Sequence, residues 1–82
     1  MTTNRAAFQE KISMLKDYEP YCFQICFFLL DSENLAVRAA KHSVYELYLD
    51  EHLYIQGDEE RKQIVRRAAI QAALLYKKSF LS

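Results

Sequence analysis

The amino-acid sequence predicts an all-α protein: a compact helical bundle of three main helices plus an N-terminal helix, in a single domain over residues 1–82. Three observations favour this fold class. Glycine and proline occur once each, which leaves few turn residues for a β-rich fold. Apolar residues recur at the three- and four-residue spacing of amphipathic helices. A chain of 82 residues is long enough for one domain and too short for two.

The first part of the chain contains two predicted helices, over residues 4–15 and 17–30. Pro20 lies early in the second of them, where its missing N–H breaks no hydrogen bond. Residues 21–30 are apolar on nearly every side, which is typical of a central helix or of one with a second face for a partner. We therefore expect most of the run from Tyr21 to Phe28 in the core.

The next helix is predicted over residues 33–53, with Asp31 or Ser32 as its N-cap. One of its faces is apolar and is expected to pack in the bundle. This core stripe consists of Ala36, Ala40, Val44, Leu47 and Tyr48. The opposite stripe mixes cationic or titratable groups with an aromatic residue and a leucine, a composition that favours an interface over a plain solvated face. It consists of Arg38, His42, Tyr45 and Leu49.

Gly57 marks the next break, and the last helix is predicted over residues 58–79. Its first residues are three acids, which a helix N-terminus favours. The expected core stripe is Ile64, Val65, Ala68, Ala69, Ala72, Leu75 and Tyr76. The other side combines cations with two aliphatic residues: Arg66, Arg67, Ile70, Gln71, Leu74, Lys77 and Lys78.

Charge is balanced overall, with 11 basic and 11 acidic residues, which argues against a uniformly basic nucleic-acid-binding protein. The distribution is uneven, because residues 58–82 carry six bases and three acids whereas residues 31–56 carry two bases and five acids. The basic C-terminal part has two interpretations that stay open: an ordinary solvated face, or a set of phosphate contacts.

The chemistry-bearing side chains point to a binding protein without catalytic residues, metal or cofactor. Cys22 and Cys26 are expected to be buried free thiols, since no second pair completes a zinc site and a disulfide at this spacing is strained. His42 and Ser43 are neighbours without an orienting carboxylate. Neither a signal peptide nor a membrane span is predicted, so a cytoplasmic location is expected.

Three parts of the sequence form a common pattern: residues 18–30, the positions Ala36, Leu47 and Tyr48, and residues 65–78. Together they resemble region 2 of the sigma-70 family of bacterial transcription factors, in its extracytoplasmic-function type. Residues 18–30, YEPYCFQICFFLL, are similar to the opening helix of that region. Ala36, Leu47 and Tyr48 fall on the alanine, aliphatic and aromatic positions of the helix that follows. Residues 65–78, VRRAAIQAALLYKK, resemble the helix that recognises the promoter −10 element. The resemblance covers nearly the whole chain and implies a stand-alone region 2, without the region 4 that reads the −35 element.

Several positions depart from the family pattern. The family presents acidic and amide side chains to the clamp helices of the RNA polymerase β′ subunit, and a reversed charge across an interface can cost several kcal/mol. The matching positions here are Val37, Arg38, Lys41 and His42. The arginine–asparagine pair of the family falls on Ile70 and Gln71, and its aspartate falls on Leu75. Tyr54 is the only obvious counterpart of the aromatic residues that help to open the promoter.

These observations leave three hypotheses. In the first, the protein acts in transcription initiation by binding RNA polymerase core and/or promoter DNA. Its protein partner is then either the β′ clamp helices of the core or a separate region-4-like protein. In the second, a degenerate sigma-like domain serves as a protein-interaction module or homodimer through Leu49, Ile70 and Leu74. The third is an unrelated helical structural protein. No membrane and no small-molecule substrate is expected. The residues expected to bind polymerase or another partner are Arg38, Lys41, His42, Tyr45 and Leu49. Those expected to bind DNA are Arg66, Arg67, Gln71, Lys77 and Lys78.

Overall fold

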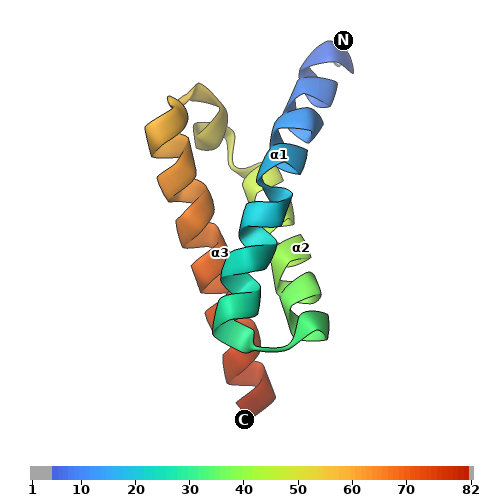
Figure 1. The fold of residues 1–82 in the computed structure, drawn as a ribbon. Coiled ribbons are helices and arrows are strands. Elements are labelled where there is room, and N and C mark those ends of the chain that lie inside the picture. The colour runs from blue at the N-terminus through green and yellow to red at the C-terminus, as the bar shows by residue number, and fades with distance from the viewer. Residues whose placement is uncertain (1–4, 82) are drawn as a thin grey trace.

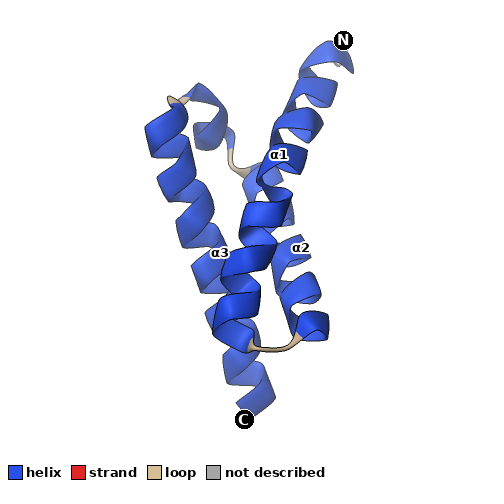
Figure 2. Ribbon diagram, in the orientation of Figure 1, coloured by secondary structure: helices blue, strands red, loops and turns tan. Residues whose placement is uncertain are grey.

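The computed structural model describes residues 5–81, which form three α-helices and a short 3-10 helix and contain no strand (Figures 1 and 2). The elements are α1 (Arg5–Leu30), α2 (Glu33–Leu49), η1 (Glu51–Ile55) and α3 (Asp58–Leu81). Each of the three α-helices packs against the other two. The chain runs along α1, returns along α2 and turns again into α3, so that α1 and α3 are parallel (Figure 1). The prediction of a compact all-α bundle is confirmed.

The prediction of a separate N-terminal helix is wrong, because α1 is one continuous helix with Pro20 inside it. A proline in a helix interior removes one hydrogen bond and costs about 3 kcal/mol. Here Pro20 faces solvent, while one apolar stripe runs past it on the opposite side, from Leu15 through Tyr18 to Cys22. Packing of this stripe on both sides of Pro20 keeps the helix continuous.

The connection between α1 and α2 is only two residues long, which makes the two helices antiparallel neighbours. Asp31 adopts a left-handed conformation, φ 52°, and its N–H donates to the carbonyl oxygen of Phe27 at 2.8 Å. This geometry is a common helix C-terminal cap, and aspartate tolerates it better than most residues. Ser32 is the N-cap of α2, since its Oγ accepts a hydrogen bond from the Leu35 N–H at 3.4 Å. Of the two capping candidates, Ser32 therefore caps α2 and Asp31 ends α1.

The helix α2 ends at Leu49, four residues before its predicted end, because the chain turns there into η1. The turn carries Leu53 into the core, where its side chain is completely buried. Asp50 stabilises the turn, since its carboxylate accepts a hydrogen bond from the His52 N–H at 3.0 Å. Burial of a leucine is worth about 1.5–3 kcal/mol, which favours the turn over continued helix.

Side chains also attach η1 to the helices. The Tyr54 hydroxyl lies 3.3 Å from the carbonyl oxygen of Leu47 and 3.2 Å from that of Tyr48, and donates to these acceptors in the last turn of α2. From α3, the Arg61 guanidinium donates to the carbonyl oxygens of Leu53 and Tyr54, at 3.2 and 3.3 Å. Arg61 therefore holds the connection in place and is a structural cation.

The core is built from small side chains, which lets the three helices approach closely. Half of the buried apolar residues among those described are alanines. The buried residues are Leu15, Cys22, Cys26, Ala36, Ala39, Ala40, Ser43, Leu47, Leu53, Val65, Ala69, Ala72 and Ala73. The predicted core stripe of α2 is confirmed, since its five residues are buried or packed against this core.

Two predictions about the core are wrong in part: the burial of the run from Tyr21 to Phe28, and the core stripe of the last helix. Cys22 and Cys26 are buried as free thiols, as predicted, but Phe28 in the same run is 85% exposed. Tyr21 and Phe27 of this run are also partly exposed, at 36% and 44%, and Leu75 of the expected α3 core stripe is 54% exposed. A helix in a three-helix bundle is covered on two sides at most, so the large residues on its outer side stay in contact with solvent.

Candidate binding surfaces

The five residues predicted to bind polymerase or another partner share one side of α2, as their spacing predicts; we call them the α2 stripe. Arg38 and Lys41 are exposed, and Tyr45 and Leu49 expose 62% and 56% of their surface. His42 is the exception, because it is half-buried. The α2 stripe is thus a surface with exposed cations and exposed apolar side chains, a composition that suits a protein interface.

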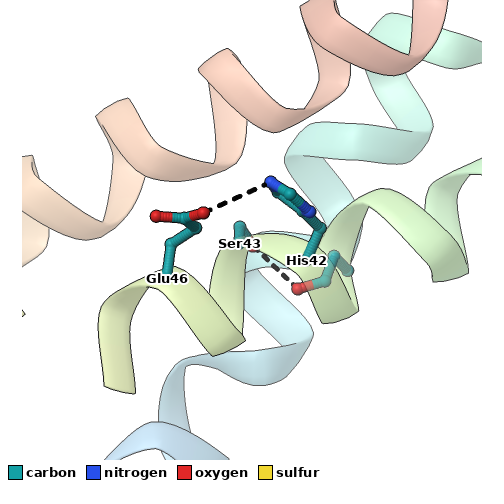
Figure 3. A network of polar contacts seen from close by, with 4 residues as sticks. His42, Ser43 and Glu46 are labelled. Atoms are coloured by element: carbon teal, nitrogen blue, oxygen red, sulfur yellow. Dashed lines mark hydrogen bonds and ion pairs between the residues drawn. The ribbon is translucent and has the colours of Figure 1, made fainter. Parts of the chain in front are cut away.

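His42 faces α3. Its Nε2 atom lies 3.6 Å from Oε2 of Glu46, one turn further along α2 (Figure 3). Its ring packs edge-on against the ring of Tyr76, with 5.9 Å between the ring centroids. The neighbouring Ser43 is completely buried, and its hydroxyl donates to the carbonyl oxygen of Ala40 at 2.7 Å (Figure 3). His42 and Ser43 therefore do not form a nucleophile–base pair.

A groove runs between α2 and α3 on the side where Glu46 lies. It consists of two adjoining hollows, which share Glu46, Ala68 and Gln71. The remaining side chains come from both helices and η1: His42, Leu47, Leu49, Asp50, His52, Ile64, Arg67, Ala72 and Leu75. The α2–α3 groove thus brings two members of each predicted set together. These are His42 and Leu49 from the partner set, with Arg67 and Gln71 from the DNA set.

Sequence reasoning missed several members of this groove. It places Leu75 in the core, and it assigns Glu46 and Asp50 to no site. The spacing of Glu46, four residues after His42, was the one available signal, because side chains at that spacing meet on a helix. With two carboxylates on the α2 side and Arg67 on the α3 side, the groove carries both signs of charge.

The residues predicted to bind DNA occupy the outer side of α3; we call them the α3 basic face. Arg66, Arg67 and Gln71 are exposed, as are the two lysines a few turns further along. Those lysines are Lys77 and Lys78. The chain contains no acidic residue after Glu60, so the carboxylates of α3 are confined to its first turn, away from these cations.

A second hollow, which the sequence did not predict, lies between α1 and α3. Its sides are almost entirely apolar and aromatic. It is lined by Tyr21, Gln24, Ile25, Phe28, Leu29, Arg66 and Ile70. The all-round apolar character of residues 21–30 was a signal for a second face, but it did not show which part of α3 would complete the hollow.

The three residues proposed for a homodimer do not form one patch. Leu49 lies in the α2–α3 groove, whereas Ile70 lies in the α1–α3 hollow. Leu74 is 51% exposed and shares a helix face with Ile70, one turn away. Arg67 and Gln71 lie beside both Leu49 and Ile70. A single dimer interface would therefore have to cover the polar ridge of Arg67 and Gln71.

The two cysteines are structural. The Cys26 thiol donates to the carbonyl oxygen of Ala69 at 3.6 Å, and burial raises the pKa of this thiol to about 11. Burial also raises the pKa of the Cys22 thiol, against a smaller lowering effect of its hydrogen bond with Ser43. Both thiols are thus protonated at neutral pH, where only the thiolate is a nucleophile or metal ligand. Among residues 5–81, no group of three His, Cys, Asp or Glu side chains can hold a metal ion.

Tyr54, the candidate for promoter opening, makes contacts that hold the fold together. Its ring lies under the Lys11 ammonium group, 4.7 Å from the Nζ atom, and its hydroxyl is bonded to α2. Burial raises the pKa of its hydroxyl group. A half-buried ring with these contacts holds η1 and α1 together.

Comparison with models of protein families, with curated proteins and with solved structures finds no match to this chain. Within the part of the chain that the structure describes, each helix is too short or too polar to cross a membrane. The fold and its surfaces define a small helical bundle with several exposed faces that have the composition of binding surfaces, and these surfaces carry the functional inference.

Proposed function

We propose that this protein is a helical module of transcription initiation, similar to region 2 of sigma-70 factors. In this proposal the α3 basic face binds promoter DNA and the α2 stripe binds RNA polymerase core. The observation that carries the proposal is the row of exposed cations on α3, with no acidic residue after Glu60. Such a face attracts phosphates through long-range electrostatics and through direct hydrogen bonds.

The cations form two pairs at the two ends of the α3 basic face. Arg66 and Arg67 lie three turns before Lys77 and Lys78. Eleven residues of helix correspond to about 16 Å, and phosphates of one DNA strand recur about every 3.4 Å along the duplex axis. The two pairs can therefore contact two separate groups of phosphates, about 16 Å apart. Between them, Gln71 can reach a base edge.

The α2 stripe suits a protein partner with an acidic surface. It presents Arg38 and Lys41 beside exposed Tyr45 and Leu49. Arginine and tyrosine are enriched at interface hot spots, and the two cations favour carboxylates on the partner. In sigma-70 factors the corresponding helix is acidic, so the contact proposed here uses a different surface of polymerase or a separate region-4-like protein.

Capture of purified bacterial RNA polymerase core tests the α2 stripe. We expect the wild-type protein to retain the core enzyme and the double variant Arg38→Glu, Lys41→Glu to lose it. Both residues are exposed, so the variant should stay folded. The matched control reverses two exposed lysines outside the α2 stripe, Lys16→Glu and Lys62→Glu. Equal loss in the control would show a dependence on net charge alone.

DNA binding is measured separately, by fluorescence anisotropy of a labelled duplex at increasing salt. Replacement of Arg67 or Lys78 by alanine should weaken binding and reduce the slope of log K against log salt by about 1 for each phosphate that the variant no longer neutralises. A slope that is unchanged in both variants would contradict DNA binding through the α3 basic face.

A second candidate function is a protein-interaction module or homodimer without DNA binding. It is favoured by the large apolar side chains that are more than half exposed on α2 and α3. These are Tyr45, Leu49, Leu74 and Leu75. Sedimentation equilibrium decides between the two functions. A stable dimer that captures neither polymerase nor DNA at low salt would replace the transcription role with this one.

A further inference from the structure

We propose that the α1–α3 hollow binds an amphipathic helix of a partner protein, one that carries acidic residues beside its apolar anchors. The hollow is a different surface from the α2 stripe. It shares Arg66 with the α3 basic face, but its α1 wall takes no part in the polymerase or DNA contacts proposed above. Three features of the hollow support this occupant. Its lining is apolar, its two aromatic residues have the spacing of helix anchors, and its charge is positive.

The lining of the hollow is suited to apolar anchor residues. Ile25 and Leu29 are half-buried and packed against the core, and Ile70 opposite them on α3 is half-buried, so this part of the hollow is preformed. Phe28 is 85% exposed and Tyr21 is 36% exposed, so the two aromatic rings stand at its edge. Its volume of about 310 Å³ provides room for side chains of a partner. Exposed aromatic residues around a preformed apolar floor are the pattern of an interface hot spot.

The dimensions of the hollow fit a helix. Tyr21 and Phe28 lie seven residues apart on one side of α1, which corresponds to about 10 Å along the helix axis. A partner helix offers apolar anchors with the same separation at positions i and i+7, with further anchors at i+3 or i+4 between them. A helix that lies along α1 can therefore place successive anchors between the two aromatic rings.

The charge around the hollow selects an acidic partner. Arg66 is the only charged residue among those that line it, and Arg67 is adjacent in sequence on the exposed side of α3. Because α3 has no acidic residue beyond Glu60, no carboxylate of this helix neutralises Arg66. A glutamate or aspartate on the flank of the partner helix can form a charge-assisted hydrogen bond with its guanidinium group.

A second copy of this chain is a poorer occupant. In a twofold dimer the same patch meets itself, so the hollow would bring Arg66 of both copies to one interface. Such like-charge contacts cost free energy when they are buried. Nucleic acid is also disfavoured, because its affinity comes from many phosphate contacts and the hollow holds a single cation. A base stacked on Phe28 is the alternative that the experiment has to separate.

A selection that does not assume the partner sequence tests the proposal. A displayed library of helical peptides about 20 residues long, or about 30 Å, is randomised on one face and selected on the wild-type protein. Counter-selection on Phe28→Ala removes peptides that bind elsewhere. Phe28 is so exposed that this variant should keep its fold, and circular dichroism checks that it does.

We expect the surviving peptides to combine leucine, isoleucine or phenylalanine anchors at i, i+3 or i+4, and i+7 with flanking glutamate or aspartate. Affinity of the best peptide should fall roughly tenfold or more in Phe28→Ala and in Arg66→Glu, and should be unchanged in Tyr45→Ala on α2. A peptide whose glutamates are replaced by lysines should bind Arg66→Glu better than wild type.

Three results would overturn the proposal. The first is a selection without Phe28-dependent peptides. The second is a set of Phe28-dependent peptides without acidic residues. The third is an oligothymidine that shifts the amide NMR resonances of Phe28 and Leu29 on the α1 wall, since it would make the hollow a nucleic-acid site. Failure here is distinct from failure of the transcription role, because polymerase capture depends on Arg38 and Lys41, which lie outside the hollow.

Discussion

The two depressions that flank α3 differ in polarity although they share this helix. The α2–α3 groove places Glu46 and Asp50 opposite Arg67, whereas the α1–α3 hollow is apolar and has Arg66 as its only lining charge. Consecutive residues on a helix point about 100° apart, so Arg66 and Arg67 reach different neighbours. The neighbours set the polarity, because α2 and the turn after it contribute Glu46 and Asp50 to the groove, whereas residues 21–30 of α1 are apolar on nearly every side. One helix thus supplies two chemically different surfaces.

The largest expected difference between the α2–α3 groove and the α1–α3 hollow is the loss of stability when a side chain is truncated. Leu47 is 1% exposed and lies beneath the α2–α3 groove. Leu47→Ala should lower the free energy of unfolding by about 2–5 kcal/mol because it leaves a cavity in the core. Phe28→Ala at the edge of the hollow should change it by about 0.5 kcal/mol or less, since that ring is exposed. Urea titrations followed by circular dichroism measure both, and equal losses would contradict this division into buried and exposed positions.

The next effect separates two neighbouring alanines of α3. Ala69 is completely buried at the contact with Cys26, so Ala69→Leu should force α1 and α3 apart and cost about 1–3 kcal/mol. Ala68 is half-buried and lines the open groove, so Ala68→Leu should cost about 0.5 kcal/mol or less. The same titrations apply. If Ala68→Leu lowered the free energy of unfolding more than Ala69→Leu, the groove would have to be closed in solution.

A smaller effect is expected from the buried thiol on the α1–α3 side. The ordinary pKa of a cysteine thiol is 9.0, and burial raises that of Cys26 to about 11. Below pH 9 the thiol is protonated in both states, and its contribution to stability is fully present. As the pH rises from 9 through about 11, the unfolded chain releases the proton first, so the free energy of unfolding falls.

Comparison of wild type with Cys26→Ala over this pH range isolates the contribution of the Cys26 thiol. The variant should lose less stability between neutral pH and pH 11 than the wild type, whatever its stability at neutral pH. If the free energy of unfolding fell with pH equally in both proteins, the thiol would ionise equally in the folded and the unfolded chain.

Local signals predicted much of the fold. Helical periodicity indicated the core stripe of α2, and the three acids after Gly57 marked the start of α3. Local rules failed where burial at a distance opposed them. Pro20 is typical of the first turn of a new helix, but the buried stripe of α1 continues past it. The predicted end of α2 is too late, because burial of Leu53 favours a turn that local propensity does not show.

Membership of the candidate surfaces was predicted in part. The residues of the α2 stripe and of the α3 basic face share their helix sides, as their spacing indicated. The position of His42 could not be predicted, because its contact with Tyr76 joins residues that are far apart in the sequence. Leu75 has helical spacing with the core residues of α3, yet it lies at the margin of that stripe, where it borders the open α2–α3 groove and stays 54% exposed.

The sequence by itself determined the helical class of this protein, the stripes of its helices and the absence of acidic residues in α3 after its first turn. These properties depend on residue type and on spacing along the chain. Only the tertiary structure decided that Arg66 borders Phe28 while Arg67 faces the side of Glu46. Periodicity shows which residues share a side of a helix, but the partner of each side is settled by the packing of all three helices together. The small residues of the core, above all its alanines, determine that packing.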